Sequence, residues 1–225
     1  MKLSAEIFRH NNEHLSSCIG VYENVIPRAM CVDIIKYYND NVEYTTRTDE
    51  EHMLIGADKP NPPRPIDAVQ YQSLQLIGDP REESKNWVDV LTHIIYPYGP
   101  KFERHLHSRC HDDHKPYDKP MSETNKMFFR SLQIQKYTPT DSGYPAVHIE
   151  DGPGHTQKYL AVILYLNDID SHNGEGGETV FPMGGRVIEP EAGLLAIWPS
   201  SLPFYHCGRP TKIDKYIITT WFEFE

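Results

Sequence analysis

Cysteine is scarce in this chain of 225 residues, which contains only four. Cys18, Cys31, Cys110 and Cys207 are widely separated, and none of them belongs to a C-x-x-C pair. The sequence therefore predicts neither a disulfide framework nor a zinc site made of paired cysteines. Free thiols, as in proteins of a reducing compartment, are expected instead.

Long hydrophobic runs are also lacking. No stretch approaches the roughly 18 apolar residues that a membrane-spanning helix needs. The opening MKLSAEIFRHNNEHL is polar and does not have the pattern of a signal peptide. We therefore expect a cytoplasmic protein that has no membrane partner.

Positive charge is in deficit, because 22 lysines and arginines stand against 32 acidic residues, giving a formal net charge of −10. Nucleic-acid binding needs cations that neutralise phosphates, so no nucleic-acid partner is expected. The motifs GxSxG, GxxxxGK[ST] and GxGxxG are absent as well. Their absence argues against a serine hydrolase elbow, a P-loop and a dinucleotide-binding turn.

The chain length suits one well-buried core, and we expect a single domain over residues 1–225. Residues 1–125 are predicted to supply helical support and loops. Within them, 21–41 predicts a short strand followed by a helix, and 84–107 predicts a second helical stretch, whose apolar pattern stops near Pro97. The predicted apolar stripe of that second stretch is Trp87, Val90, Leu91, Ile94 and Ile95.

Residues 126–225 are predicted to form a β core. Short runs rich in β-branched and aromatic residues are separated there by glycine and proline. These runs are FFRSLQIQKY, KYLAVILYLND, GETVFP, GRVIEP, GLLAIWP and KYIITTWFEFE. Several short strands at this density indicate a sandwich or barrel, so the predicted fold class is mainly β with supporting N-terminal helices.

The motif AVHIEDG contains the first candidate metal ligands. Residues i and i+2 of a strand point to the same face, so His148 and Glu150 are predicted to project together, with Asp151 on the other face. His206, in PFYHCGRP, offers a third ligand. Two histidines and one carboxylate leave three positions of a metal open, which suits non-haem Fe(II).

Lys215 begins the strand-like run KYIITTWFEF and is flanked by apolar and aromatic residues. A buried ammonium is costly unless it has a partner, and the far carboxylate of a dicarboxylate would supply one. The alternative is an exposed strand start, in which only the apolar stem of the lysine is covered.

The segment YLNDIDSHNGEGGETVFP strongly resembles the YLN…GGETxFP segment of the prolyl-4-hydroxylase-like 2-oxoglutarate oxygenases. The resemblance covers about residues 127–225 and includes VIEPEAGLLAIWP and KYIITTWF. It implies a double-stranded β-helix, a jelly-roll or cupin-like fold. It also implies Fe(2+), 2-oxoglutarate as cosubstrate, O₂, and ascorbate as a further candidate cofactor.

In this resemblance, His148, Glu150 and His206 match the iron ligands, and Lys215 matches the residue that pairs with the distal carboxylate of 2-oxoglutarate. Further matched positions line the cosubstrate pocket or pack behind the metal: Tyr137, Thr179, Tyr165, Thr219 and Trp221. For the aromatic residues and Thr219, a role in the core is the alternative. The implied substrate is a prolyl residue in a peptide or protein, and a free amino acid or other small molecule is the alternative.

The sequence departs from the usual family pattern at Glu150, where His-x-Asp is more common and phage-type members carry glutamate. The longer carboxylate is compatible with iron, but it leaves open a catalytically weak or inactive binding module. A cupin-like metal protein of another class is a further alternative, against which Lys215 and GGETVFP argue. The cluster of His105, His107, Cys110, His111 and His114 could bind zinc, although a solvated turn is the expected role.

Overall fold

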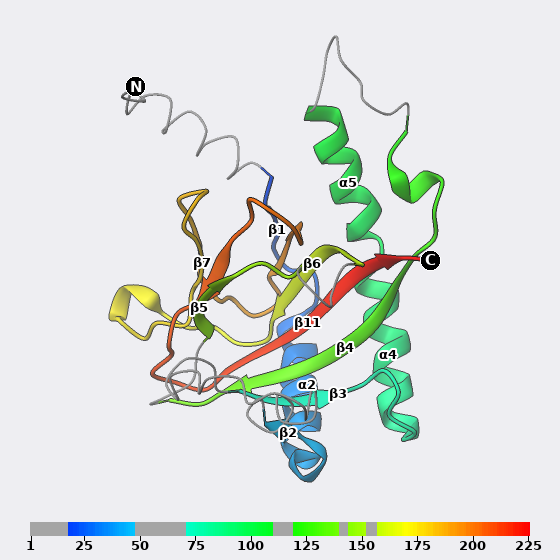
Figure 1. Ribbon diagram of the computed structural model, residues 1–225. Coiled ribbons are helices and arrows are strands. Elements are labelled where there is room, and N and C mark those ends of the chain that lie inside the picture. The colour runs from blue at the N-terminus through cyan, green and yellow to red at the C-terminus, as the bar shows by residue number, and fades with distance from the viewer. Residues whose placement is uncertain (1–17, 48–70, 110–118, 140–143, 152–156) are drawn as a thin grey trace, which may run out of the picture.

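The computed structural model describes residues 18–47, 71–109, 119–139, 144–151 and 157–225. In these residues two antiparallel β-sheets form a sandwich, and three α-helices cover the outer face of the larger sheet (Figure 1). The predicted mainly β architecture with supporting helices is therefore confirmed. No helix in the described part of the chain is long and apolar enough to cross a membrane.

The larger sheet has seven strands in the order β1-β9-β6-β11-β4-β3-β2. Their bounds are β1 (Gly20–Tyr22), β9 (Leu195–Pro199), β6 (Lys158–Tyr165), β11 (Lys215–Phe224), β4 (Met127–Tyr137), β3 (Gln72–Gln75) and β2 (Thr46–Arg47). The smaller sheet has the order β5-β10-β7-β8. Its bounds are β5 (Tyr144–His148), β10 (His206–Gly208), β7 (Thr179–Phe181) and β8 (Arg186–Ile188).

Side-chain alternation along the long central strand β11 divides the core into two layers. Tyr216 and Ile218 point to the helices, whereas Ile217 points to the smaller sheet. Strand β11 pairs with β4 on one side and β6 on the other, so every second residue along it is fixed toward the gap between the sheets. Lys215 begins this inward-facing series, which positions it for the site.

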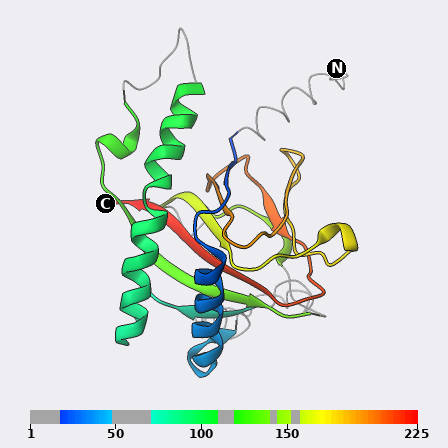
Figure 2. The same cartoon turned by 180° about the vertical axis from the view of Figure 1, so that it is seen from behind.

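The helices are α2 (Arg28–Asp40), α4 (Glu82–Ile95) and α5 (Tyr98–Arg109). Figure 2 shows them together on one face of the larger sheet. Short 3-10 turns complete the described helical structure, namely η1 (Val42–Tyr44), η2 (Met121–Glu123) and η3 (Ser171–Asn173). The helices bury the outer face of the larger sheet, so the metal-ligand candidates lie on the side away from them.

The second predicted helical stretch is two helices rather than one. Helix α4 ends before Pro97, and α5 begins directly after it, because proline cannot donate the backbone hydrogen bond that a continuous helix needs. Leu91 and Ile95 are fully buried, as predicted. Val90, however, is 40% exposed, because α4 rests on the sheet along a stripe narrower than the predicted one.

Candidate active site

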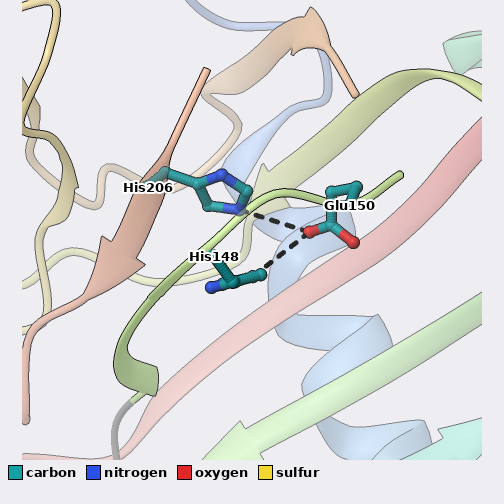
Figure 3. A group of neighbouring side chains, drawn as sticks. All are labelled: His148, Glu150 and His206. Atoms are coloured by element: carbon teal, nitrogen blue, oxygen red, sulfur yellow. Dashed lines mark hydrogen bonds and ion pairs between the residues drawn. The ribbon is translucent and has the colours of Figure 1, made fainter. Parts of the chain in front are cut away.

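The three candidate ligands come from two neighbouring strands of the smaller sheet. His148 ends β5, His206 begins β10, and the two residues are partners in the antiparallel register. Glu150 follows just beyond the end of β5. Figure 3 shows the three side chains turned toward one another.

The ligand atoms of this group lie within 4.8 Å of one another. Oε1 of Glu150 is 3.2 Å from Nε2 of His206 and 3.6 Å from Nε2 of His148. Among the described residues, this is the group of histidine, cysteine and acidic side chains arranged to hold a metal ion. Asp151, the alternative carboxylate, is not part of it.

The backbone of Glu150 is anchored to the larger sheet through Ser200. The amides of Glu150 and Asp151 both donate to the carbonyl oxygen of Ser200, at 3.0 and 2.9 Å. The amide of Ser200 in turn donates to the carbonyl of Tyr159 in β6, at 3.1 Å. The segment after β5 therefore has a fixed position, although it has already left the strand.

His206 is 4% exposed and held by rings on two sides. Its ring packs edge-on against Trp198, with centroids 4.9 Å apart, and 5.6 Å from the ring of Phe181. Nδ1 donates to the carbonyl oxygen of Phe204 at 3.1 Å, because a carbonyl can only accept. This bond fixes the ring so that Nε2 faces Glu150, which is how metal-binding histidines are oriented in proteins.

The charge of Glu150 is maintained by its partners. Burial by itself raises the pKa of this carboxyl group. Hydrogen bonds from His148 and His206, with the positive charge of Lys158, outweigh burial and hold the pKa of Glu150 well below its usual value. The carboxyl group of Glu150 is therefore an anion at neutral pH.

Lys215 is buried, with 4% of its surface exposed, so the alternative of an exposed strand start is wrong. Its Nζ donates to the carbonyl oxygen of Gly177 at 2.6 Å and lies 5.4 and 5.5 Å from the ring centroids of Tyr137 and Tyr165. Burial lowers the pKa of Lys215 to about 8, against the opposing charge of Glu178. An anion beside this ammonium would relieve the cost of its burial.

Two of the predicted pocket residues are joined by a hydrogen bond. The hydroxyl of Tyr165 donates to Oγ1 of Thr179 at 2.6 Å, and both residues are buried. The hydroxyl of Tyr137 donates to Oε1 of Gln135 at 2.9 Å, and burial raises the pKa of Tyr137 well above its usual value. Together with Lys215, these residues form one polar wall inside the sandwich.

Thr219 and Trp221 lie further along the same inward face of β11. Trp221 contacts Lys158, whose Nζ is 3.7 Å from the centre of its ring, and Lys158 in turn contacts Glu150. The inner face of β11 therefore leads from Lys215 toward the metal-ligand group, with Thr219 between the two ends. No motif in the sequence indicated Lys158, because its partners are brought to it only by folding.

The second histidine cluster lies mostly outside the described residues. His105 and His107 are on α5, whereas Cys110, His111 and His114 are not described. The resemblance also predicts that loops near residues 44–66, 108–124 and 168–176 lie over the site. Residues 168–176 are described and contain η3, whereas most of the other two segments lies outside the described residues.

Gly176 holds the loop that presents the carbonyl of Gly177 to Lys215. Its φ is +75°, and a Cβ placed there would lie 2.1 Å from the carbonyl oxygen of Pro210. We expect Gly176→Ala to cost more than the roughly 1–3 kcal/mol of a strained left-handed residue, because the clash adds to the strain. Chemical unfolding of the variant measures this cost.

Gly185→Ala is the matched control, because Gly185 has a φ of +62° and open space around the added Cβ. It is expected to show the conformational strain without the clash. Equal losses of unfolding free energy in the two variants would contradict the tight packing of Gly176 against Pro210.

Two histidines and one carboxylate inside a two-sheet sandwich form a group that could hold a metal ion, and this set of donors is the one that suits non-haem Fe(II). Residues 132–223 match the family model described as the 2OG-Fe(II) oxygenase superfamily. The predicted resemblance to the 2-oxoglutarate oxygenases is therefore confirmed over these residues, and the predicted cofactors, Fe(2+) and 2-oxoglutarate, are those that the description of the superfamily names. No curated protein matches the chain significantly by sequence.

Solved structures of prolyl hydroxylases have a similar fold. A prolyl hydroxylase from Trichoplax adhaerens, in complex with a hypoxia inducible factor peptide fragment, matches with a TM-score of 0.64 at 15% identity, covering 99% of this chain and 94% of that one. A Pseudomonas putida prolyl-4-hydroxylase matches with a TM-score of 0.60 at 14% identity, covering 96% and 98%. The viral collagen prolyl hydroxylase from Paramecium Bursaria Chlorella virus-1, in its 2OG complex, matches with a TM-score of 0.51 at 15% identity, covering 92% and 95%. The predicted double-stranded β-helix is therefore confirmed.

Proposed function

We propose that this protein is an Fe(II)- and 2-oxoglutarate-dependent hydroxylase that acts on a prolyl residue in a peptide or protein. The observation that carries the proposal is the joint presence of the His148, Glu150 and His206 group and the buried ammonium of Lys215 inside one sandwich. The substrate class rests on the resemblance to prolyl hydroxylases, one of which binds a peptide fragment.

The donor set of the triad fits iron. Two neutral imidazole nitrogens and one carboxylate oxygen suit Fe(II) and leave positions for a cosubstrate that binds through two oxygens and for O₂. The carboxylate supplies one negative charge, so the bound centre keeps a net positive charge that attracts an anionic cosubstrate. His206 is already held with Nε2 toward the site by its bond to Phe204.

Lys215 and Thr179 would hold the distal carboxylate of 2-oxoglutarate. The ammonium of Lys215 has three N–H donors, and the bond to Gly177 uses one of them. The hydroxyl of Thr179 accepts from Tyr165, so its own proton is free to be donated to an anion. A charged donor and a neutral donor beside each other suit a carboxylate with two oxygens.

Tyr137 and Thr219 would serve this cosubstrate in different ways. The proton of the Tyr137 hydroxyl is engaged by Gln135, so this bond must break before Tyr137 donates to a carboxylate. Burial keeps Tyr137 protonated, which preserves it as a donor. Thr219 stands between Lys215 and the metal-ligand end of β11, where it would line the middle of the cosubstrate.

In the proposed reaction, 2-oxoglutarate, O₂ and a C–H bond are converted to succinate, CO₂ and a C–OH bond, so one oxygen atom enters each organic product. Iron supplies the activation of O₂ when it is bound. The residues of the chain supply the rest: they fix the ligand geometry, neutralise the cosubstrate and keep its far end in place. Such positioning by a rigid scaffold is what the protein contributes to cofactor chemistry.

The proposal predicts two measurable products. Protein loaded with Fe(II) should convert 2-oxoglutarate to succinate and should add one oxygen atom to proline residues of a peptide library, as measured by mass spectrometry. His148→Ala is the control and should form neither product. Hydroxylation of free proline alone would replace the peptide substrate by a small molecule, and 2-oxoglutarate binding without succinate would indicate a binding module instead.

A further inference from the structure

Lys158 contacts the metal-ligand group although it is not a ligand itself. It begins β6, and its Nζ lies 3.5 Å from Oε2 of Glu150. The same Nζ lies 3.7 Å from the ring centre of Trp221 on β11. The side chain is 17% exposed, so the ammonium is held between a carboxylate and an aromatic face at the border of the site.

The two oxygens of Glu150 therefore have different partners. Oε1 faces the Nε2 atoms of His148 and His206, whereas Oε2 faces the ammonium of Lys158. A metal ion between the imidazoles would meet Oε1 first. Oε2 would stay paired with a positive charge on the other side of the carboxylate.

This division matters because the ligand is glutamate. Glutamate has one more rotatable bond than aspartate, so its carboxylate can turn more freely and can offer both oxygens to a metal. A second bound oxygen would occupy one of the three positions that the cosubstrate and O₂ require. A partner that holds Oε2 away from the metal prevents this loss.

We propose that Lys158 is a positioning residue that keeps Glu150 a one-oxygen ligand, and that Trp221 holds the ammonium in place. The inference rests on the proposed function in that the triad binds a divalent metal and that 2-oxoglutarate binds to the metal-loaded protein. It assigns to Lys158 a role that depends on the length of Glu150. The role would not arise for a shorter carboxylate that cannot reach the ammonium.

The charge of Lys158 gives this role a distinctive signature. An ammonium beside the ligand carboxylate repels a metal cation, so its removal should not weaken metal binding. Its removal should instead release Oε2 to the metal and weaken the binding of 2-oxoglutarate. A residue that merely supports the local structure would show the opposite pattern, with the metal lost as well.

The test uses Co(II) as a probe on the full chain, with Lys158→Met as the variant. Calorimetry should show equal or tighter Co(II) binding than in the unchanged protein. The visible absorption of the bound Co(II) should shift, because one more carboxylate oxygen joins it. The Kd of 2-oxoglutarate for the Co(II) protein should rise about 10-fold, the scale of lost support around a metal site. Lys158→Arg should restore the original values.

Lys101→Met is the matched control, because the ammonium of Lys101 also lies near aromatic rings, Tyr22 and Tyr98, but on α5. It should change none of these values. In a Glu150→Asp background, Lys158→Met should have no effect on the Co(II) spectrum or on 2-oxoglutarate affinity.

Two results would overturn the inference while leaving the proposed function intact: a Lys158→Met variant that binds Co(II) and 2-oxoglutarate as the unchanged protein does, or an equal effect of this substitution in the Glu150→Asp background. If the unchanged protein fails to bind Co(II) at the triad, the proposed function fails as well. Circular dichroism of each variant separates these results from a loss of folding.

Discussion

Replacing His206 by alanine is expected to abolish Fe(II) binding and the formation of succinate. In the proposed metal centre His206 is one of three protein ligands, and its Nε2 faces Oε1 of Glu150 at 3.2 Å. Loss of a residue that merely supports a metal ligand costs about 10–100-fold in metal affinity or activity, so loss of the ligand itself should exceed about 100-fold. Metal content after dialysis and the rate of succinate formation measure the effect.

The control for this substitution is His172→Ala. The side chain of His172 is 87% exposed and lies 3.4 Å from Glu189, away from the triad. Metal content and turnover should both stay at the level of the unchanged protein. Unchanged metal content in the His206→Ala protein would refute the metal centre, provided that circular dichroism shows both variants to be folded.

The strands of the second half could be predicted because local composition and tertiary environment agree there. All six predicted runs form strands, and β11 illustrates the reason. Apart from Lys215 and Glu223, its residues are β-branched or aromatic on both faces, which suits a central strand buried on both sides. The short strands β2 and β3 were not predicted, because Thr46–Arg47 and Gln72–Gln75 carry no comparable run.

In the helical half of the chain, local sequence patterns predicted the type of structure but not its details. Spacing indicated the helical character of residues 84–107, but not that α5 begins directly after Pro97. The exposure of Val90 depends on how closely α4 lies against the sheet, which no local pattern contains.

The candidate ligands could be predicted from the sequence because their spacing follows the family pattern. Strand alternation, the other argument, does not apply to Glu150, which lies beyond the end of β5. The residues around the ligands could not be predicted. Ser200, which directly follows β9, anchors the backbone of Glu150, and Lys158 of β6 contacts its carboxylate. Both residues reach Glu150 only after the sheets have formed. The same holds for the carbonyl of Gly177, which accepts from Lys215 although the two residues are 38 positions apart in the sequence. Such contacts have no sequence signature.

These contacts explain how a glutamate can take the place of the more common aspartate in the triad. Glu150 lies beyond the end of β5, is fixed by its backbone to Ser200, and shares its two oxygens between the imidazoles and an ammonium. A longer side chain suits a position outside the strand, because it brings the carboxylate back to the histidines. The structure therefore accommodates the departure from His-x-Asp without separating the ligands.

Replacing Lys215 by methionine is expected to remove 2-oxoglutarate binding while sparing the metal. Truncating one partner of a buried charge pair costs about 2 kcal/mol or more, which is a loss of affinity of about 30-fold or more. Titration of the Co(II)-loaded protein with 2-oxoglutarate measures it, and Co(II) binding itself should be unchanged. Lys136→Met is the control, because Lys136 pairs with Asp214 at 2.8 Å and lies by Tyr216 on the helix side of the sheet.

The same substitution should change how stability depends on pH. The pKa of Lys215 is about 8 in the fold and 10.5 in the unfolded chain. Below about pH 8 the ammonium is charged in the folded and the unfolded chain, so the folded state carries the full cost of burying the charge. Above about pH 10.5 the amine is neutral in both states, and this cost is absent. The unfolded chain binds more protons between these values, so the free energy of unfolding without cosubstrate should rise with pH, by about 3 kcal/mol at most.

Lys215→Met should lack this rise, whereas Lys136→Met should keep it. Chemical unfolding at pH 7.5, 9 and 10.5 would reveal the difference, since the methionine has no charge to lose. Bound 2-oxoglutarate should also flatten the profile of the unchanged protein, because an anion beside the ammonium raises its pKa again. An equal rise in the Lys215→Met protein would show that another group titrates and that Lys215 is not a buried, poorly paired cation.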